Sequence, residues 1–315
     1  MPHTSRLQIG LMMRNGDHRA PGAGRVVPWP ELREMATLAD DVGIDTLFVP
    51  DHLLFRNAGA VVVPEGETRG MWEAFTLLSA LAAVTSRVTL GPFVACTSFR
   101  NPALLAKMAA TLDHVSGGRL LLGLGAGWHE PEYDAFGYHF DHLAGRFEEA
   151  LGIILPLLKG EHVTFKGTYY EVDDAVIHPP GPRPNGPPIW IGAKGPRMLR
   201  LVARHADAYN TIMHATPDTL AEPFAKLDAA CREVGRDPSE ILKTAACFVA
   251  LPGAEDDPGG LIEPRIQGTP EQIAEQLAAL HDAGVQHMTC FTSPVGPRSV
   301  EGLGRVIELL RASGR

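Results

Sequence analysis

Short apolar runs alternate along the chain with segments whose apolar residues recur at helical spacing. The first run covers residues 7–13. The helix expected to begin at Pro30 carries its apolar residues three or four positions apart, at Leu32, Met35, Ala36 and Ala39. The runs are almost wholly apolar rather than alternating, which is typical of parallel strands buried on both faces. The pattern therefore predicts a parallel sheet covered by helices.

The same alternation continues to the end of the chain. The expected strands are residues 7–13, 45–49, 88–95, 119–124, 188–193, 207–212, 241–251 and 285–292. Besides the helix at Pro30 and a fourth helix that ends before residue 161, the expected helices are 73–85, 102–114, 196–205, 217–234, 270–283 and 300–312. Several begin with proline, whose missing N–H is harmless in the first turn. Thr269 and Gln272 predict a capping box.

Eight strand–helix units of this kind point to an α/β fold, a closed (β/α)8 TIM barrel, as one domain over residues 1–315. An open, doubly wound sheet is the alternative. Two segments depart from the repeat: a long loop over 51–70, and an insertion over 161–187 after the fourth helix, which reads as a hairpin turning at Lys166 and Gly167. Barrel active sites form from the loops after the strands, so we expect both segments to border a pocket.

Composition and charge narrow the choice of partners. The 315-residue chain has a formal net charge of −9 and a pI near 5.8. Binding of nucleic acid or of an anionic membrane surface requires clustered Lys and Arg, so we expect neither. Cys96, Cys231, Cys247 and Cys290 lie far apart, which indicates reduced thiols rather than a disulfide framework. With neither a signal-peptide pattern nor an apolar run long enough to span a bilayer, the expected location is cytoplasmic.

Two polar residues follow the second expected strand. Asp51 and His52 lie where that strand ends, on the rim where barrel enzymes place their catalytic groups. A histidine exchanges protons near neutral pH, and a neighbouring carboxylate can orient it or stabilise its charge. We therefore expect His52 to be catalytic and Asp51 to support it.

Two further strand ends have features of a ligand site. The fourth expected strand ends at Gly123, Gly125 and Gly127, where a backbone without Cβ atoms can approach a flat or charged ligand. The fifth ends in small residues before a helix that opens with Lys194 and Arg197 close by. Free N–H groups in the first turn of a helix attract anions, so this corner predicts a phosphate site.

Two other classes of protein stay open from these residues alone. A barrel that binds flavin without turnover needs the same loops but no proton-transfer group. A metal-dependent hydrolase needs a ligand set, and the polar residues between 129 and 142 show no recognised metal-ligand spacing. The sequence also contains no H-E-x-x-H, G-x-S-x-G or Walker A motif, so we expect no metal.

Three longer stretches carry a family resemblance. They are DTLFVPDH (45–52), the segment from SALAAVTSRVTLGPF through GLGAGWHEPEYDAFG (79–137), and PPIWIGAKGPRMLRLVARHADAYN (187–210). Together they resemble the luciferase-like (bacterial luciferase) superfamily, and more closely its branch of oxidoreductases that use the deazaflavin coenzyme F420. The resemblance implies a (β/α)8 barrel and a bound F420, with FMN as the alternative coenzyme.

The resemblance also implies roles for single residues. Asp51 and His52 match a pair beside the coenzyme ring. Phe93 and Val94 match a strand bulge in which such enzymes have a non-proline cis peptide. Cys96 and Thr97 would lie near the ring edge.

The rest of the coenzyme would lie along two later segments. Ala126 and Gly127 match the segment beside the ribityl chain, and the loop that follows adds Trp128 and Tyr133. The phosphate site matches Ala193, Lys194, Gly195 and Arg197.

One position departs from the family pattern. Deazaflavin-dependent sugar-phosphate dehydrogenases have a glutamate general base where this chain has Trp128, so Glu130 or Glu132 would have to replace it. The resemblance therefore favours hydride transfer from the deazaflavin to a small molecule, with reduction of an activated C=C or C=N bond, over sugar-phosphate oxidation. An FMN-dependent monooxygenase is the alternative.

Aromatic residues are candidates for the substrate pocket. Trp29, Phe55 and Trp72, with Met71, follow the first two strands and could line an apolar pocket. We also expect the protein to act on a small-molecule substrate as a homodimer.

Overall fold

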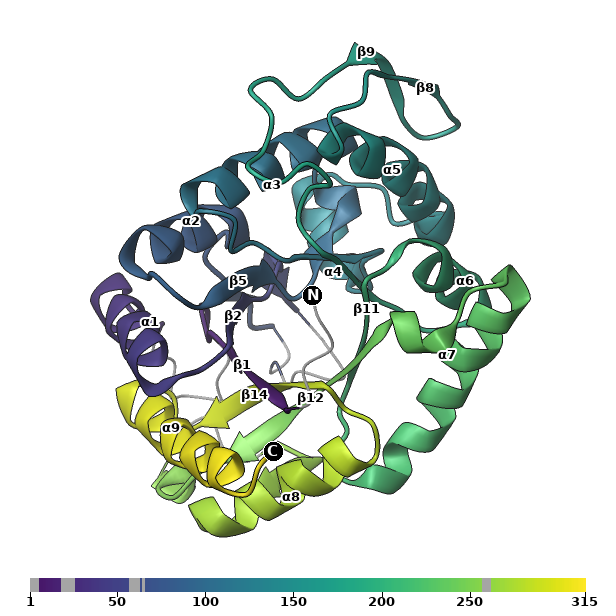
Figure 1. Ribbon diagram of the computed structural model, residues 1–315. Helices are drawn as coiled ribbons and strands as arrows, with labels where there is room; N and C mark the ends of the chain where they lie inside the picture. Colours follow the sequence, from purple (N-terminus) through teal and green to yellow (C-terminus); the bar gives the residue numbers. More distant parts are fainter. Residues whose placement is uncertain (1–5, 18–25, 57–62, 64–65, 257–261) are drawn as a thin grey trace.

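The computed structural model describes residues 6–17, 26–56, 63, 66–256 and 262–315. In this part of the chain, parallel strands form a barrel and helices surround it (Figure 1). The predicted (β/α)8 architecture is confirmed, and the doubly wound alternative is wrong. No described helix combines the length and the apolar character needed to cross a membrane.

The barrel strands follow the order β5-β2-β1-β14-β12-β11-β10-β7-β6. Their bounds are β1 (Gln8–Met12), β2 (Thr46–Val49), β5 (Thr89–Pro92), β6 (Ala95–Cys96), β7 (Leu122–Gly125), β10 (Ile189–Gly192), β11 (Ala208–Ile212), β12 (Leu242–Ala250) and β14 (His287–Ser293). β5 and β6 together correspond to the third predicted strand, which is divided. The first part, β5, pairs with β2, and the second part, β6, pairs with β7. A parallel bridge between Leu90 of β5 and Leu120, just before β7, connects the two ends of this strand order. A short strand, β13 (Arg265–Gln267), also pairs with β12.

The helices of the outer ring follow the predicted order. They are α1 (Trp29–Val42), α2 (Ala74–Val84), α3 (Pro102–Val115), α5 (Leu143–Leu158), α6 (Pro196–His205), α7 (Ala221–Val234), α8 (Pro270–Asp282) and α9 (Pro297–Ala312). Side chains cap several of them: Glu73 accepts backbone N–H groups at the start of α2, and Asn101 does so at α3. The predicted capping box of Thr269 and Gln272 is present at α8.

Four details differ from the prediction. The stretch after β7, expected to be a polar loop, contains the short helix α4 (Glu130–Phe136). The last helix begins at Pro297, three residues before the predicted start, because proline fits its first turn. The third strand is divided into β5 and β6. The long loop over 51–70, which follows β2 and is called the second loop below, contains a small antiparallel pair, β3 (Leu54–Phe55) with β4 (Arg69–Gly70). Short 3-10 turns are η1 (Thr97–Phe99), η2 (Pro217–Leu220), η3 (Pro238–Glu240) and η4 (Ala254–Asp256).

The insertion forms the predicted hairpin, β8 (Val163–Lys166) with β9 (Glu171–Ala175), outside the ring of helices near α5 (Figure 1). Its tip is fixed by one carboxylate, because Glu149 on α5 accepts the backbone N–H groups of Thr168, Tyr169 and Tyr170 at 2.7–3.1 Å. The hairpin tip therefore lies against the first half of α5.

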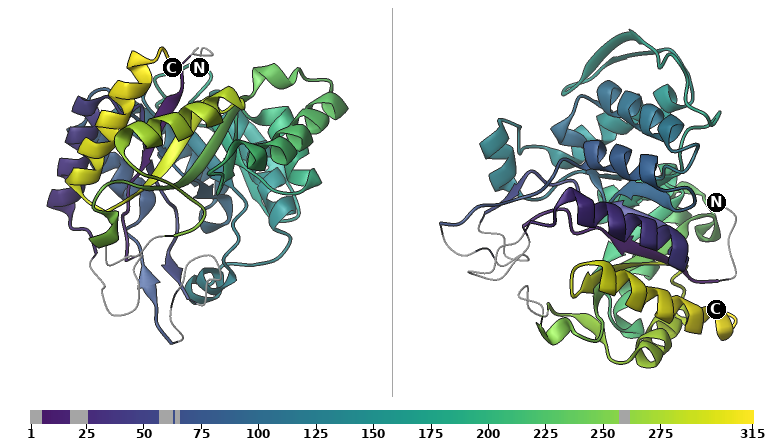
Figure 2. Two further views of the ribbon diagram at one scale, coloured as in Figure 1. Left: turned by 90° about the horizontal axis from the view of Figure 1, so that it is seen from below. Right: turned by 90° about the vertical axis from the view of Figure 1, so that its left-hand side faces the viewer.

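The interior of the barrel is filled with side chains. A buried cluster there contains Phe48 and Trp190, whose ring centroids are 5.5 Å apart, and the ring of His287 packs against both. Burial lowers the pKa of His287 to about 4, so this ring is neutral at physiological pH. In the left view of Figure 2, α4 and the loop segments after the strands gather at one end of the barrel, opposite the last turn of α9. That end is where polar side chains converge.

Candidate active site

The central feature at the carboxyl ends of the strands is a pair formed by His52 and Glu132. Nδ1 of His52 lies 2.8 Å from Oε1 of Glu132, and the second carboxylate oxygen accepts the backbone N–H of Leu53 at 2.8 Å. Glu132 is 1% exposed, whereas the His52 side chain is 18% exposed. An ionised carboxylate can only accept, so Nδ1 carries the proton and Nε2 is the atom left to exchange one with a ligand.

Asp51 has a different partner from the one expected. Its carboxylate forms a bidentate ion pair with Arg100, at 2.7 and 2.9 Å, and accepts the backbone N–H of Cys96 at 2.9 Å. Burial alone would lower the pKa of Arg100, but its ion pairs with Asp51 and Glu73 outweigh burial and raise that pKa. The expectation that Asp51 orients His52 is therefore wrong: Glu132 does so, and Asp51 ties the end of β2 to the segment after β6.

The bulge in the third strand contains the expected feature. The peptide bond between Phe93 and Val94 is cis, as the resemblance implied. The glycines of the neighbouring strands leave room for this bulge, because a Cβ on Gly125 would lie 2.6 Å from a methyl group of Val94 and one on Gly123 would collide with the carbonyl oxygen of Pro92. At these two positions the missing side chains admit the bulge rather than a ligand.

This close packing predicts that Gly123→Ala destabilises the protein. The added methyl group meets backbone, which cannot move aside as a flexible side chain can, so we expect a loss of about 1–3 kcal/mol. The matched control is Gly70→Ala, since no atom lies within 4 Å of the added Cβ there. Denaturant unfolding of both variants measures the difference, and equal stabilities would contradict the packing argument.

Three of the predicted coenzyme residues are buried in the wall behind the glycine turn. Tyr133 is 0% exposed, donates its hydroxyl hydrogen to the carbonyl oxygen of Ala126 at 3.0 Å, and lies 3.0 Å from Sγ of Cys96. Burial raises the pKa of Cys96 to about 12, so its thiol is protonated. Thr97 is also 0% exposed and donates to the carbonyl oxygen of Gly125 at 3.4 Å. These side chains support the turn at Ala126 and Gly127 from behind and present no open surface.

An aromatic cluster surrounds His52. Its ring centroid lies 4.5 Å from that of Phe55 and 5.5 Å from that of Trp128, and Trp128 in turn lies 5.1 Å from His129. Phe55 is buried, but Trp128 is 50% exposed. An apolar aromatic surface therefore lies beside the imidazole of His52.

The other two predicted substrate residues lie farther out. Trp72 is 54% exposed, and its backbone bonds to Asn15 at the end of β1 hold it at the rim. Trp29 is 40% exposed and begins α1. Among the described residues, no ring contact joins either tryptophan to the cluster around His52.

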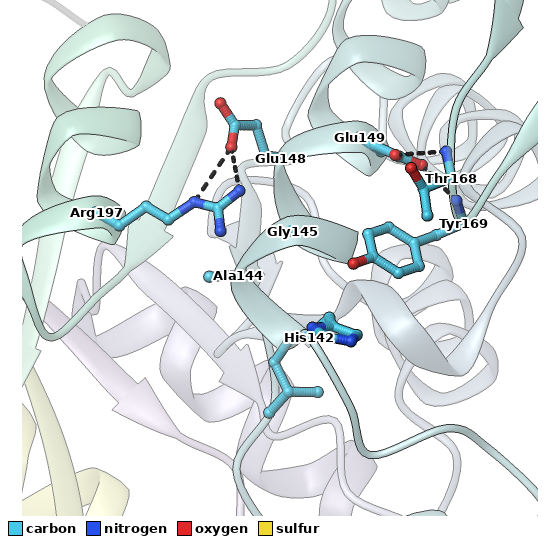
Figure 3. A pocket seen from close by; sticks show the side chains of 9 residues that line it. His142, Ala144, Gly145, Glu148, Glu149, Thr168, Tyr169 and Arg197 are labelled. Carbon is cyan, nitrogen blue, oxygen red and sulfur yellow. Dashed lines mark hydrogen bonds and ion pairs between the residues drawn. The ribbon is translucent and has the colours of Figure 1, made fainter.

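The four residues of the predicted phosphate site differ in burial and in pairing. Ala193 is buried, whereas Lys194 and Gly195 are exposed, and no atom lies within 4 Å of a Cβ built on Gly195. Arg197, on the first turn of α6, forms an ion pair with Glu148 of α5 at 2.6 Å (Figure 3). The two residues border a cavity of about 520 Å³ that also reaches Tyr169 at the hairpin tip (Figure 3). Any anion bound by Arg197 must therefore compete with Glu148.

Comparison with known protein families identifies the family of this chain. A model of the luciferase-like monooxygenase family matches residues 7–258, which is most of the chain. The chain belongs to the luciferase-like monooxygenase family. Among the described residues, no group of three or more His, Cys, Asp or Glu side chains is arranged to hold a metal ion.

Individual members of the luciferase-like family cover parts of this chain. It is 35% identical over 228 residues to a phthiodiolone/phenolphthiodiolone dimycocerosates ketoreductase of Mycobacterium sp. (strain JLS), covering 68% of this chain and 59% of the relative. It is 35% identical over 217 residues to an F420-dependent glucose-6-phosphate dehydrogenase of Microbacterium testaceum (strain StLB037), covering 67% and 61%. This chain thus spans about three fifths of either relative. A solved riboflavin lyase (RcaE) with modified FMN shares the fold, with a TM-score of 0.80 at 16% identity and coverage of 98% and 92%.

Three residues of this luciferase-like site were not found from the sequence. Arg100 pairs with Asp51, Glu148 pairs with Arg197, and His129 accepts the backbone N–H of Arg56 at 3.2 Å. A buried carboxylate requires a cationic partner, so an aspartate at the end of a buried strand indicates that an Arg or Lys lies close to it in the fold. His129 and Glu148 carry no comparable pattern in the sequence.

Proposed function

We propose that this protein is an oxidoreductase that uses the deazaflavin coenzyme F420 to reduce a polarised C=C or C=N bond of a small organic substrate. The observation that carries the proposal is the His52–Glu132 pair beside the half-exposed Trp128. A polarised double bond needs a hydride at one end and a proton at the other. The pair is suited to the second requirement.

Proton delivery follows from the geometry of the pair. With Nδ1–H held by the buried carboxylate of Glu132, a proton on Nε2 makes the imidazole a cation whose charge the carboxylate stabilises. His52 can then donate from Nε2 to a substrate atom that develops negative charge, and regain a proton from water. Trp128 and Phe55 offer an apolar surface against which the substrate can lie.

The residues fit a bound deazaflavin. The exposed Lys194 and the open position at Gly195 would form an anion cradle at the first turn of α6, where a phosphate would bind. The turn at Ala126 and Gly127 and the bulge at Val94 would border the ring and its chain. When bound in its reduced form, the coenzyme supplies a hydride. The curated F420-dependent relative, at 35% identity, supports this choice of coenzyme.

A reduced-flavin monooxygenase is the second candidate, because a solved enzyme of the same fold holds a modified FMN. The two chemistries diverge at oxygen, since a deazaflavin reacts poorly with it. Titration of the apo-protein with F420 and with FMN, followed by fluorescence, tests the choice of coenzyme. We expect tighter binding of F420, while tight FMN binding with oxygen consumption on reduction would favour the monooxygenase.

The ion pair at the cradle makes a two-sided prediction. Arg197→Ala should weaken coenzyme binding by roughly ten to a hundredfold, because a charge-assisted hydrogen bond contributes about 1.5–3 kcal/mol. Glu148→Gln should leave binding unchanged or tighten it, because it removes the competing carboxylate from Arg197. Dissociation constants at low and high salt check both changes. If Arg197→Ala binds the coenzyme as tightly as the wild type at low salt, Arg197 does not contact the coenzyme.

A further inference from the structure

His129 lies at the junction of the second loop and α4, and the proton transfer described above does not use it. It is 4% exposed, and its ring packs against both Phe55, at 5.4 Å, and Trp128, at 5.1 Å. Its Nε2 accepts the backbone N–H of Arg56 at 3.2 Å. A nitrogen that accepts a hydrogen bond has no proton, so the ring is neutral with its hydrogen on Nδ1.

A second bond joins the same two segments. The backbone N–H of Leu53 donates to Oε2 of Glu132 at 2.8 Å. The start of α4 therefore holds the second loop at two amides three residues apart, through His129 and Glu132. His52 immediately precedes the first of these amides, and Phe55 lies between them.

We propose that His129 is a positioning residue: its neutral ring fixes the segment 53–56 against α4 and so sets the places of His52 and Phe55 at the substrate surface. The proposal rests on the proposed function where it concerns substrate. The fixation itself is a property of the protein without coenzyme or substrate.

The charges around His129 give this contact a pH dependence. Burial lowers the pKa of His129, the charge of Glu132 acts in the opposite direction, and the charge of His52 lowers it further. Nε of the Arg56 guanidinium donates to Oγ1 of Thr68 at 2.7 Å. Because the folded protein depresses the pKa of His129, the stability that the contact contributes is complete above the unfolded value of about 6.5, and the contact is lost as pH falls through the lower folded value.

Two variants separate the acceptor from the shape of the ring. His129→Phe keeps an aromatic ring in contact with Phe55 and Trp128 but leaves the Arg56 amide without an acceptor. His129→Gln places an amide oxygen near the position of Nε2 and does not titrate. Residue-resolved hydrogen exchange of the apo-protein measures the contact directly, and thermal unfolding shows whether both variants are folded.

At neutral pH we expect the Arg56 amide to exchange about tenfold faster in His129→Phe than in the wild type, and at nearly the wild-type rate in His129→Gln. On acidification, protection should fall in the wild type and persist in His129→Gln. With a cyclic enone as probe substrate, KM should rise about tenfold in His129→Phe while the coenzyme dissociation constant stays unchanged.

Wild-type exchange at Arg56 in His129→Phe would overturn the proposal, as would equally fast exchange in the Phe and Gln variants. An unchanged KM together with faster exchange would also overturn it, because the fixation would then have no effect on substrate. If no probe is reduced by any variant, the proposed function fails and the exchange measurement still decides the contact.

Discussion

His52→Ala should lower kcat by about 10²–10⁴, the range that general acid catalysis usually contributes. The loss follows from the removal of Nε2, the atom that the Glu132 carboxylate leaves available for proton exchange. Affinity for the coenzyme should change far less, because the cradle at Lys194 and Gly195 does not involve the imidazole. Single-turnover oxidation of reduced coenzyme by the probe substrate measures the chemical step.

A structural role for His52 makes a different prediction. If the pair with Glu132 only ties down the second loop, His52→Ala should lower thermal stability and weaken coenzyme binding together. Glu132→Gln is the matched comparison, because it replaces the carboxylate with an amide of the same size and so removes the counter-charge for a protonated His52. It should lower kcat less than His52→Ala does. A His52→Ala protein that melts early yet turns over at the wild-type rate would remove His52 from the mechanism.

Arg100→Met should reduce the free energy of unfolding by about 3–5 kcal/mol, the cost of leaving a buried charge without its partner. The Asp51 side chain is 1% exposed, and that of Arg100 is 10% exposed. Arg100 also pairs with Glu73 at 2.6 Å and lies over the ring of Phe75 at 4.8 Å, so the methionine loses polar contacts but keeps part of the packing. Denaturant unfolding measures the loss.

The double variant Asp51→Asn with Arg100→Met is the control, because it removes both charges. If the unpaired carboxylate causes the loss, the double variant should recover part of the stability of the single variant. Additive losses would contradict this explanation and indicate that the two side chains act independently.

The barrel was predictable because its signal is local. Most barrel strands are buried on both faces, so they read as apolar runs, and the outer helices show their apolar stripes within a few turns. The division of the third strand was not visible in that pattern, because Phe93 and Val94 are as apolar as the residues on either side. Helix α4 was missed because seven residues are too few to show a helical period.

The candidate site was predicted in part. The positional rule for barrels found His52, but its pairing with Asp51 was inferred from adjacency in the sequence. Consecutive residues in an extended chain point to opposite sides, so Asp51 turns toward Arg100 while His52 turns toward Glu132. Glu132 is 80 residues away from His52, and a contact at that separation depends on the closed barrel.

The pairing of Arg197 shows the same limit. Charge near a helix start predicted an anion site, but the carboxylate of Glu148 reaches Arg197 from α5, 49 residues earlier. Local sequence shows which side chains carry charge, and tertiary packing decides which of them remain available to a ligand. The single-domain organisation, the homodimer and the cytoplasmic location stay predictions from the sequence.

The most direct test of the proposed function is an anaerobic single turnover with reduced F420 carrying deuterium at its hydride-donating carbon, and a panel of cyclic enones and imines as probe substrates. The proposal predicts oxidation of the coenzyme and a product with one deuterium from it and one hydrogen from solvent. The contrary result is that no probe oxidises reduced F420, while in a parallel aerobic reaction reduced FMN consumes oxygen and gives a product that contains an atom from labelled O₂.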